Sequence, residues 1–130
     1  MRIISALVFC LFLASPAWAE EILYCSDTDK NGYFWDKDGN AKRTGFNPKR
    51  FTVKVISETK RVISEDGYES EYTCDKKLGA YHCRETNGFN MSPIIFGPKG
   101  FTRAYLLGTP LGVGIFDPNI YVAYGTCTKF

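Results

Sequence analysis

The segment from Asp27 to Asp38 carries a residue spacing that matches a calcium-binding motif. It begins D-T-D-K-N-G, so oxygen-bearing side chains stand at positions one, three and five, with glycine at six and aspartate at twelve. In a calcium loop such oxygens converge on the cation and the glycine makes the bend. Those loops lie between helices and end in a glutamate, whereas the residues before Asp27 are typical of a strand. Because tight turns prefer the same residues, we predict a turn without metal and keep a calcium-binding surface protein as one alternative.

Other residues with reactive side chains are poorly placed for catalysis. His82 is the one histidine of the chain, and its neighbour Cys83 should point to the opposite face of a strand. A zinc site needs about four ligands, so we predict that Cys74 and Cys83 form a disulfide rather than a metal site. Glu69 and Glu71 share the polar face of their strand, away from the apolar surroundings that raise the pKa of a general acid. We therefore expect no catalytic residue, no metal, no cofactor and no enzymatic activity.

The first 19 residues are typical of a secretory signal peptide. Arg2 gives a basic start, the apolar run that follows is too short to span a bilayer, and Ala17-Trp18-Ala19 matches the pattern before a cleavage site. We predict cleavage into a leader, residues 1–19, and one mature domain, residues 20–130, that is secreted or periplasmic and has no membrane span. Cys10 leaves with the leader, so an even number of cysteines remains, which predicts disulfides in an exported chain.

The pairing of the remaining cysteines follows from the expected strand register. A tight turn at residues 78–79 places Cys74 opposite Cys83 in neighbouring antiparallel strands, within reach of a disulfide. Elimination then pairs Cys25 with Cys127. This second bridge joins the first strand of the mature domain to the last, and closing a sheet in this way removes its exposed edges.

The mature domain is predicted to be all β. Short runs of β-branched and aromatic residues alternate with turn signals, and no segment shows sustained helical spacing. We expect strands at residues 22–25 and 33–35, followed by a long polar loop at residues 36–49. Asp66-Gly67 predicts a hairpin turn, and Tyr68 should point inward in the strand after it. The predicted architecture is a small antiparallel up-and-down barrel or compact sandwich of about seven to nine strands, stapled by two disulfides.

Basic residues are concentrated in the middle of the chain. Residues 37–61 hold eight lysines or arginines, whereas residues 62–75 hold five acids and no base. We interpret the basic residues, Arg61 among them, as a solvated surface whose neighbouring strands carry opposite charges. The formal net charge of +2 gives no indication of nucleic-acid binding.

Elimination leaves non-catalytic binding as the predicted function. We expect an unidentified protein partner, approached as an inhibitor or interaction module; the alternatives are a barrel that carries a small apolar ligand and the calcium-binding protein considered above. Aromatic residues and arginine dominate protein interfaces, and Trp35 lies in a turn-rich segment where packing explains it less well. The predicted interaction surface consists of Tyr33, Phe34, Trp35, Lys42, Arg43, Lys49 and Arg50. In general plan the chain resembles the bacterial periplasmic β-barrel inhibitors of lysozyme, a resemblance of architecture that gives no residue a role.

Overall fold

The computed structural model describes residues 20–36, 38–87, 92–106 and 119–129. The predicted leader, residues 1–19, lies outside the described residues. Among those that are described, no helix is long and apolar enough to cross a membrane.

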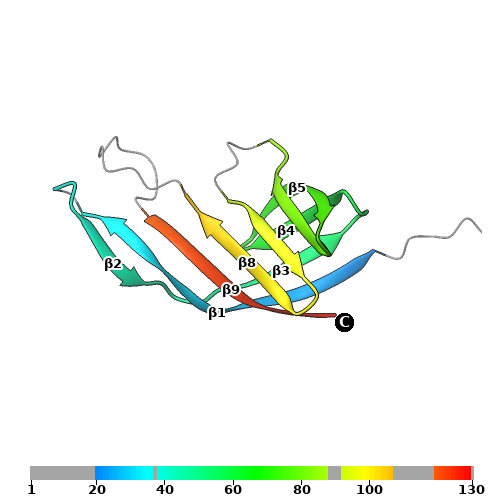
Figure 1. The fold of residues 1–130 in the computed structure, drawn as a ribbon, viewed down its shortest axis with the longest axis horizontal. Coiled ribbons are helices and arrows are strands. Elements are labelled where there is room, and N and C mark those ends of the chain that lie inside the picture. Colours follow the sequence, from blue (N-terminus) through cyan, green and yellow to red (C-terminus); the bar gives the residue numbers. More distant parts are fainter. Residues whose placement is uncertain (1–19, 37, 88–91, 107–118, 130) are drawn as a thin grey trace, which may run out of the picture.

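The described residues form one antiparallel sheet of nine strands, eight of which close into a barrel (Figure 1). The barrel strands follow one another in chain order from β1 through β3 to β9, and β9 pairs with β1 to complete the circle. The remaining strand, β2, pairs with the second half of β1 and lies at the edge of the sheet. The all-β prediction is therefore confirmed, with a barrel rather than a sandwich. The bounds are β1 Glu21–Trp35, β2 Ala41–Gly45, β3 Arg50–Val55, β4 Lys60–Glu65, β5 Tyr68–Lys77, β6 Ala80–Glu85, β7 Ile94–Gly97, β8 Gly100–Tyr105 and β9 Asn119–Lys129.

Strand β1 differs from the prediction because it continues through the turn-prone segment. The predicted strands at residues 22–25 and 33–35 are two parts of one strand of 15 residues, and part of the predicted loop at 36–49 is strand β2. Pairing with β9 extends over almost the whole of β1 and includes a register shift between Asp27 and Asp29. Pairing with β9, together with this bulge, keeps these residues in a strand although their local preference is for a turn. Residues 27–35 of the segment that matches the calcium motif are therefore extended β structure rather than a loop.

Gly32 shows why a glycine stands in the middle of this strand. A Cβ atom at this position would collide with the backbone oxygen of Ile120 in β9. The glycine therefore permits close approach of β1 and β9, and its place in a D-T-D-K-N-G sequence reflects packing of two strands rather than a bend.

Two predicted hairpin turns are confirmed. Asp66 and Gly67 have φ values of 50° and 82°, and Leu78 and Gly79 have φ values of 53° and 78°. Positive φ at both central residues is the geometry of the type I′ turn, which matches the twist of the flanking strands. Tyr68, predicted to point inward, lines a cavity at one end of the barrel but is 80% exposed, because it begins β5 at the rim.

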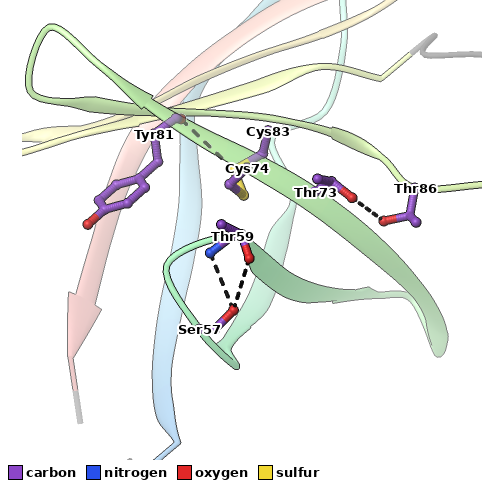
Figure 2. Close-up of a disulfide and its surroundings, with 7 residues drawn as sticks. All are labelled: Ser57, Thr59, Thr73, Cys74, Tyr81, Cys83 and Thr86. Carbon is purple, nitrogen blue, oxygen red and sulfur yellow. Dashed lines mark hydrogen bonds between the residues drawn. A yellow bond between two sulfur atoms is a disulfide. The ribbon is translucent and has the colours of Figure 1, made fainter.

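The two predicted disulfides are confirmed. Cys25–Cys127 and Cys74–Cys83 join residues that are directly opposed in neighbouring antiparallel strands, with Cα atoms 4.0 and 4.1 Å apart. Figure 2 shows the second bridge beside Thr59, whose backbone carbonyl accepts a 2.8 Å hydrogen bond from the Cys74 N–H. Two disulfides indicate an oxidising, extracellular-type environment.

The middle of the barrel is filled by side chains from its strands. Phe51 and Phe101 meet edge to face with ring centroids 4.9 Å apart, and Val53 is completely buried. The interior of an eight-stranded barrel is just wide enough to be filled by side chains, and aromatic rings fill much of the space here. The core consists of Cys25, Phe51, Val53, Ile63, Tyr72, Cys74, Cys83, Ile94, Phe96 and Phe101.

Candidate functional site

The barrel has a cavity at each end. The first, which we call the Arg61 cavity, has a volume of about 590 Å³ and is lined by the ends of β3, β5, β7 and β9 and the starts of β1, β4, β6 and β8. The second, which we call the Arg103 cavity, has a volume of about 660 Å³ and lies at the opposite end. Both volumes fall within the range of small-molecule sites. Each end of the barrel therefore has room for a small ligand.

Strand alternation places Arg61 inside the barrel. In β4, Arg61, Ile63 and Glu65 share the inward face, and Arg61 is only 6% exposed. Its guanidinium carbon lies 4.6 Å from the Tyr81 ring centroid and 4.5 Å from that of Phe96. The interpretation of Arg61 as a surface base is therefore wrong.

The side chain of Arg61 forms no ion pair with the described residues. Its buried Nε atom has no hydrogen bond, and no carboxylate of the described residues lies within 4.0 Å of the group. Burial lowers the pKa of Arg61, and the negative charge of Glu21 opposes this effect. Arginine remains charged in such surroundings, so the Arg61 cavity contains a cation without a counter-ion from the described chain.

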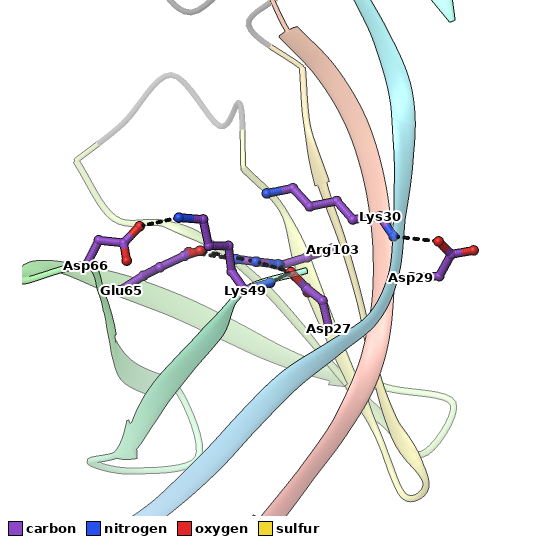
Figure 3. A network of polar contacts seen from close by, with 7 residues as sticks. All are labelled: Asp27, Asp29, Lys30, Lys49, Glu65, Asp66 and Arg103. Atoms are coloured by element: carbon purple, nitrogen blue, oxygen red, sulfur yellow. Dashed lines mark hydrogen bonds and ion pairs between the residues drawn. The ribbon is translucent and has the colours of Figure 1, made fainter. Parts of the chain in front are cut away.

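Arg103, at the other end of the barrel, is fully paired (Figure 3). Its Nε and Nη2 atoms donate to the two Asp27 oxygens at 3.0 and 2.7 Å. Its Nη1 and Nη2 atoms donate to Glu65 at 2.7 and 3.2 Å. Burial alone would lower the pKa of Arg103, but hydrogen bonds to Glu65 and Asp27 outweigh it and raise the pKa above its ordinary value. The network is structural in character, because each charge in it has a partner.

Lys30 enters the Arg103 cavity because of the bulge in β1. Asp27 points inward, and the register shift before Asp29 turns Asp29 outward and Lys30 inward, where Lys30 is only 7% exposed. Its ammonium lies 3.9 Å from the centroid of the Tyr121 ring, and no carboxylate of the described residues is within 4.0 Å. Burial lowers the pKa of Lys30, and the positive charge of Arg103 lowers it further.

Aromatic rings line the mouth of the Arg103 cavity. Tyr121 stacks on Tyr105 with centroids 5.4 Å apart and contacts Phe46 at 5.5 Å. Burial raises the pKa of Tyr121 to about 12, so the phenol is neutral at ordinary pH. Deeper in the cavity, the Tyr72 hydroxyl donates to Glu85 at 3.4 Å.

The residues of the predicted interaction surface lie partly together. Tyr33 faces Arg43 and Phe34 faces Lys42 across the β1–β2 hairpin, which also holds Trp35. Tyr33 is 48% exposed, whereas Phe34 and Trp35 are half-buried. The β1–β2 hairpin lies at the left of the view in Figure 1.

Lys49 and Arg50 lie away from the β1–β2 hairpin, whereas Lys42 is on it. Lys49 is at the rim of the Arg103 cavity, where its ammonium pairs with Asp66 at 3.1 Å. Arg50 is the exposed first residue of β3. Lys42, on the hairpin, pairs with Asp36 at 3.6 Å. Binding by this set of residues stays a prediction.

The residues considered for metal binding are dispersed by the fold. Asp27 is inside the barrel with Arg103 and Asp29 is outside. His82 is exposed, and Cys83 is buried in its disulfide. Within the described ranges, no group of three or more histidine, cysteine, aspartate or glutamate side chains could hold a metal ion.

Comparisons with protein-family models, with curated proteins and with solved structures found no match for this chain.

Proposed function

We propose that this chain is an exported, non-catalytic binding protein that holds a small ligand inside one end of its barrel. The observation that supports the proposal is the Arg61 cavity, a space of about 590 Å³ whose lining combines apolar side chains such as Leu23 and Val55 with charged groups that include Arg61. Ligand sites of globular proteins have volumes in this range, and mouths of β-barrels are common places for them. Export is supported by the leader pattern of residues 1–19 and by the two disulfides.

The placement of reactive side chains supports binding rather than catalysis. All four cysteines of the described chain are in disulfides, and His82 lies exposed on the outer face of β6. Glu69 and Glu71 are exposed on the outer face of β5. Cys127 lines the Arg61 cavity, but its sulfur is bonded to Cys25, and none of the other groups named here lines either cavity.

A protein partner is a second candidate function, favoured by the free edge of β2. Within the described residues β2 pairs only with β1, so its other edge presents unpaired backbone groups. A partner strand can add to such an edge, and Tyr33 and Arg43 would then lie close to it. This is the inhibitor-like or interaction-module function that the sequence suggests.

Native mass spectrometry of the exported protein tests the proposed function. We expect protein that is produced with its own leader and recovered from the periplasm to show a mass larger than that of the disulfide-bonded chain. The excess should disappear under denaturing conditions and be recovered as a small molecule in the organic extract. An unchanged native mass, together with no uptake of any component from an added envelope extract, would count against the proposal.

Affinity capture distinguishes binding of a protein partner from binding of a small ligand. If the protein partner is the biological ligand, a specific protein should co-purify with the wild-type chain and be lost when Tyr33 and Arg43 are both replaced by alanine. Under the proposed function, the same double substitution should leave the co-purifying small molecule in place.

A further inference from the structure

Arg61 is a buried cation that forms no ion pair with a carboxylate of the described residues. Isolated buried charges are costly, and proteins normally pair them and satisfy their donors. The chain does so for Arg103, which makes four hydrogen bonds to two carboxylates. At the opposite end of the barrel Arg61 is 6% exposed, and its Nε donates to nothing. No described residue supplies a partner for Arg61, so a bound ligand could provide it.

The rings of Tyr81 and Phe96 restrict how a ligand can reach the Arg61 guanidinium. Tyr81 and Phe96 both lie against the Arg61 guanidinium, at 4.6 and 4.5 Å. Contacts of this type use the face of the ring and leave the N–H groups at the edge of the guanidinium free. A planar anion that accepts two parallel N–H bonds fits this edge, and a carboxylate has that geometry.

The walls and rim of the cavity indicate the rest of the ligand. Leu23, Val55 and Ile56 provide apolar wall, which suits hydrocarbon. Lys76 and Lys99 stand at the rim, and neither is within 4.0 Å of a carboxylate of the described residues. Glu21 and Glu58 also line the cavity, so the described lining holds four basic groups (Arg61, Lys76, Lys99 and Lys129) against two acidic ones. This excess of positive charge favours the approach of anions.

We infer that the Arg61 cavity binds an amphiphilic carboxylate, with the carboxylate paired to Arg61 and the hydrocarbon packed against the apolar wall. The inference rests on the proposed function, because it names the ligand class for that same cavity. Arg61 is the specificity-determining residue, and Tyr81 and Phe96 hold its guanidinium in position.

Calorimetric titration with three ten-carbon probes tests the ligand class. The probes are decanoate, the neutral decanol and the cationic decyltrimethylammonium ion, which share a chain and differ in head group. We expect decanoate to bind about 10- to 100-fold more tightly than either of the others, the range given by hydrogen bonds to a charged group.

Substitutions test whether Arg61 is responsible for the preference for decanoate. Arg61→Gln should reduce the affinity for decanoate about 10- to 100-fold, so that decanoate and decanol bind with similar affinity. Arg61→Lys should retain part of the preference for decanoate, because lysine keeps the positive charge but lacks the two parallel N–H donors of the guanidinium. The matched control is Lys60→Gln, which removes one positive charge from the adjacent, outward-facing position of β4. That control should leave decanoate affinity unchanged.

A second measurement separates a ligand-binding role from a structural one. Because no carboxylate of the described residues pairs with Arg61, Arg61→Gln should not lower the melting temperature of the ligand-free protein, while a given concentration of decanoate should raise the melting temperature more in the wild type than in the variant. A large fall in melting temperature with unchanged decanoate affinity would overturn the inference. Equal binding of decanoate and decanol would do the same, and so would loss of decanoate binding in Lys30→Gln rather than in Arg61→Gln. A neutral molecule recovered from the native protein, without decanoate binding, would overturn the carboxylate class and leave the proposed function standing.

Discussion

Removal of the Cys25–Cys127 disulfide is expected to lower the free energy of unfolding by about 4 to 5 kcal/mol. The bridge spans 102 residues and joins the first strand of the barrel to the last, so the reduced unfolded chain gains the freedom of nearly the whole domain. In the chain-entropy model the stabilisation grows with the length of the closed loop. The change to make is Cys25→Ala with Cys127→Ala, and urea unfolding followed by circular dichroism gives the free energy.

The short disulfide provides the matched control. Cys74 and Cys83 are separated by 9 residues, for which the same model gives about 2.5 kcal/mol. Cys74→Ala with Cys83→Ala should therefore cost less than the change to the long bridge. The reverse order, or equal losses, would show that closure of the barrel by β1 and β9 does not depend on the covalent link.

Replacement of Arg103 by methionine is expected to cost about 3 to 5 kcal/mol. The reason is that Asp27, whose side chain is 0% exposed, and the partly buried Glu65 would keep their negative charges after losing the guanidinium. Methionine retains much of the packing against Phe51, whose ring lies 4.5 Å from the Arg103 guanidinium. The loss can be measured as a shift in the urea midpoint.

Two further variants determine whether the cost comes from unpaired charge. Adding Asp27→Asn and Glu65→Gln to Arg103→Met should recover a large part of the loss, because the stranded charges are then gone. Lys60→Gln breaks the half-exposed pair between Lys60 and Glu71, whose atoms are 3.4 Å apart, and should cost less than about 1 kcal/mol. If Arg103→Met cost no more than Lys60→Gln, the interior network would contribute little to stability.

The parts of the fold that depend on local geometry could be predicted from the sequence. Cys74 and Cys83 are placed symmetrically about a tight turn, so the register of two strands follows from the turn alone. Asp66-Gly67 has the backbone preferences that a type I′ turn requires. Once one disulfide was placed, the pairing of Cys25 with Cys127 followed, and with it the prediction that the first and last strands of the mature domain are joined.

The parts that depend on distant contacts could not be predicted. Residues 27–32 favour a turn locally, but pairing with β9, about a hundred residues later in the chain, keeps them in a strand. The bulge before Asp29 reverses which side chains face inward, so Lys30 cannot be placed by counting alternate residues.

Arg61 was missed for a different reason. The alternation of Arg61, Ile63 and Glu65 is visible in the sequence, and it puts the arginine on the same face as a buried isoleucine. Charged residues are rarely buried, so a lysine- and arginine-rich segment is ordinarily interpreted as surface. The closed barrel, in which the Tyr81 and Phe96 rings lie 4.6 and 4.5 Å from the guanidinium carbon, identifies Arg61 as an interior group.

Chemical-shift mapping by NMR tests most directly whether the ligand lies inside the barrel at Arg61. Decanoate would be added to ¹⁵N-labelled protein recovered from the periplasm with both disulfides formed. We predict that the largest amide shifts occur at Leu23, Val55 and Tyr81, which line the cavity, and that the Nε–H signal of the Arg61 side chain moves with them. Shifts confined to the β1–β2 hairpin, with the Arg61 Nε–H signal unmoved, would contradict this account.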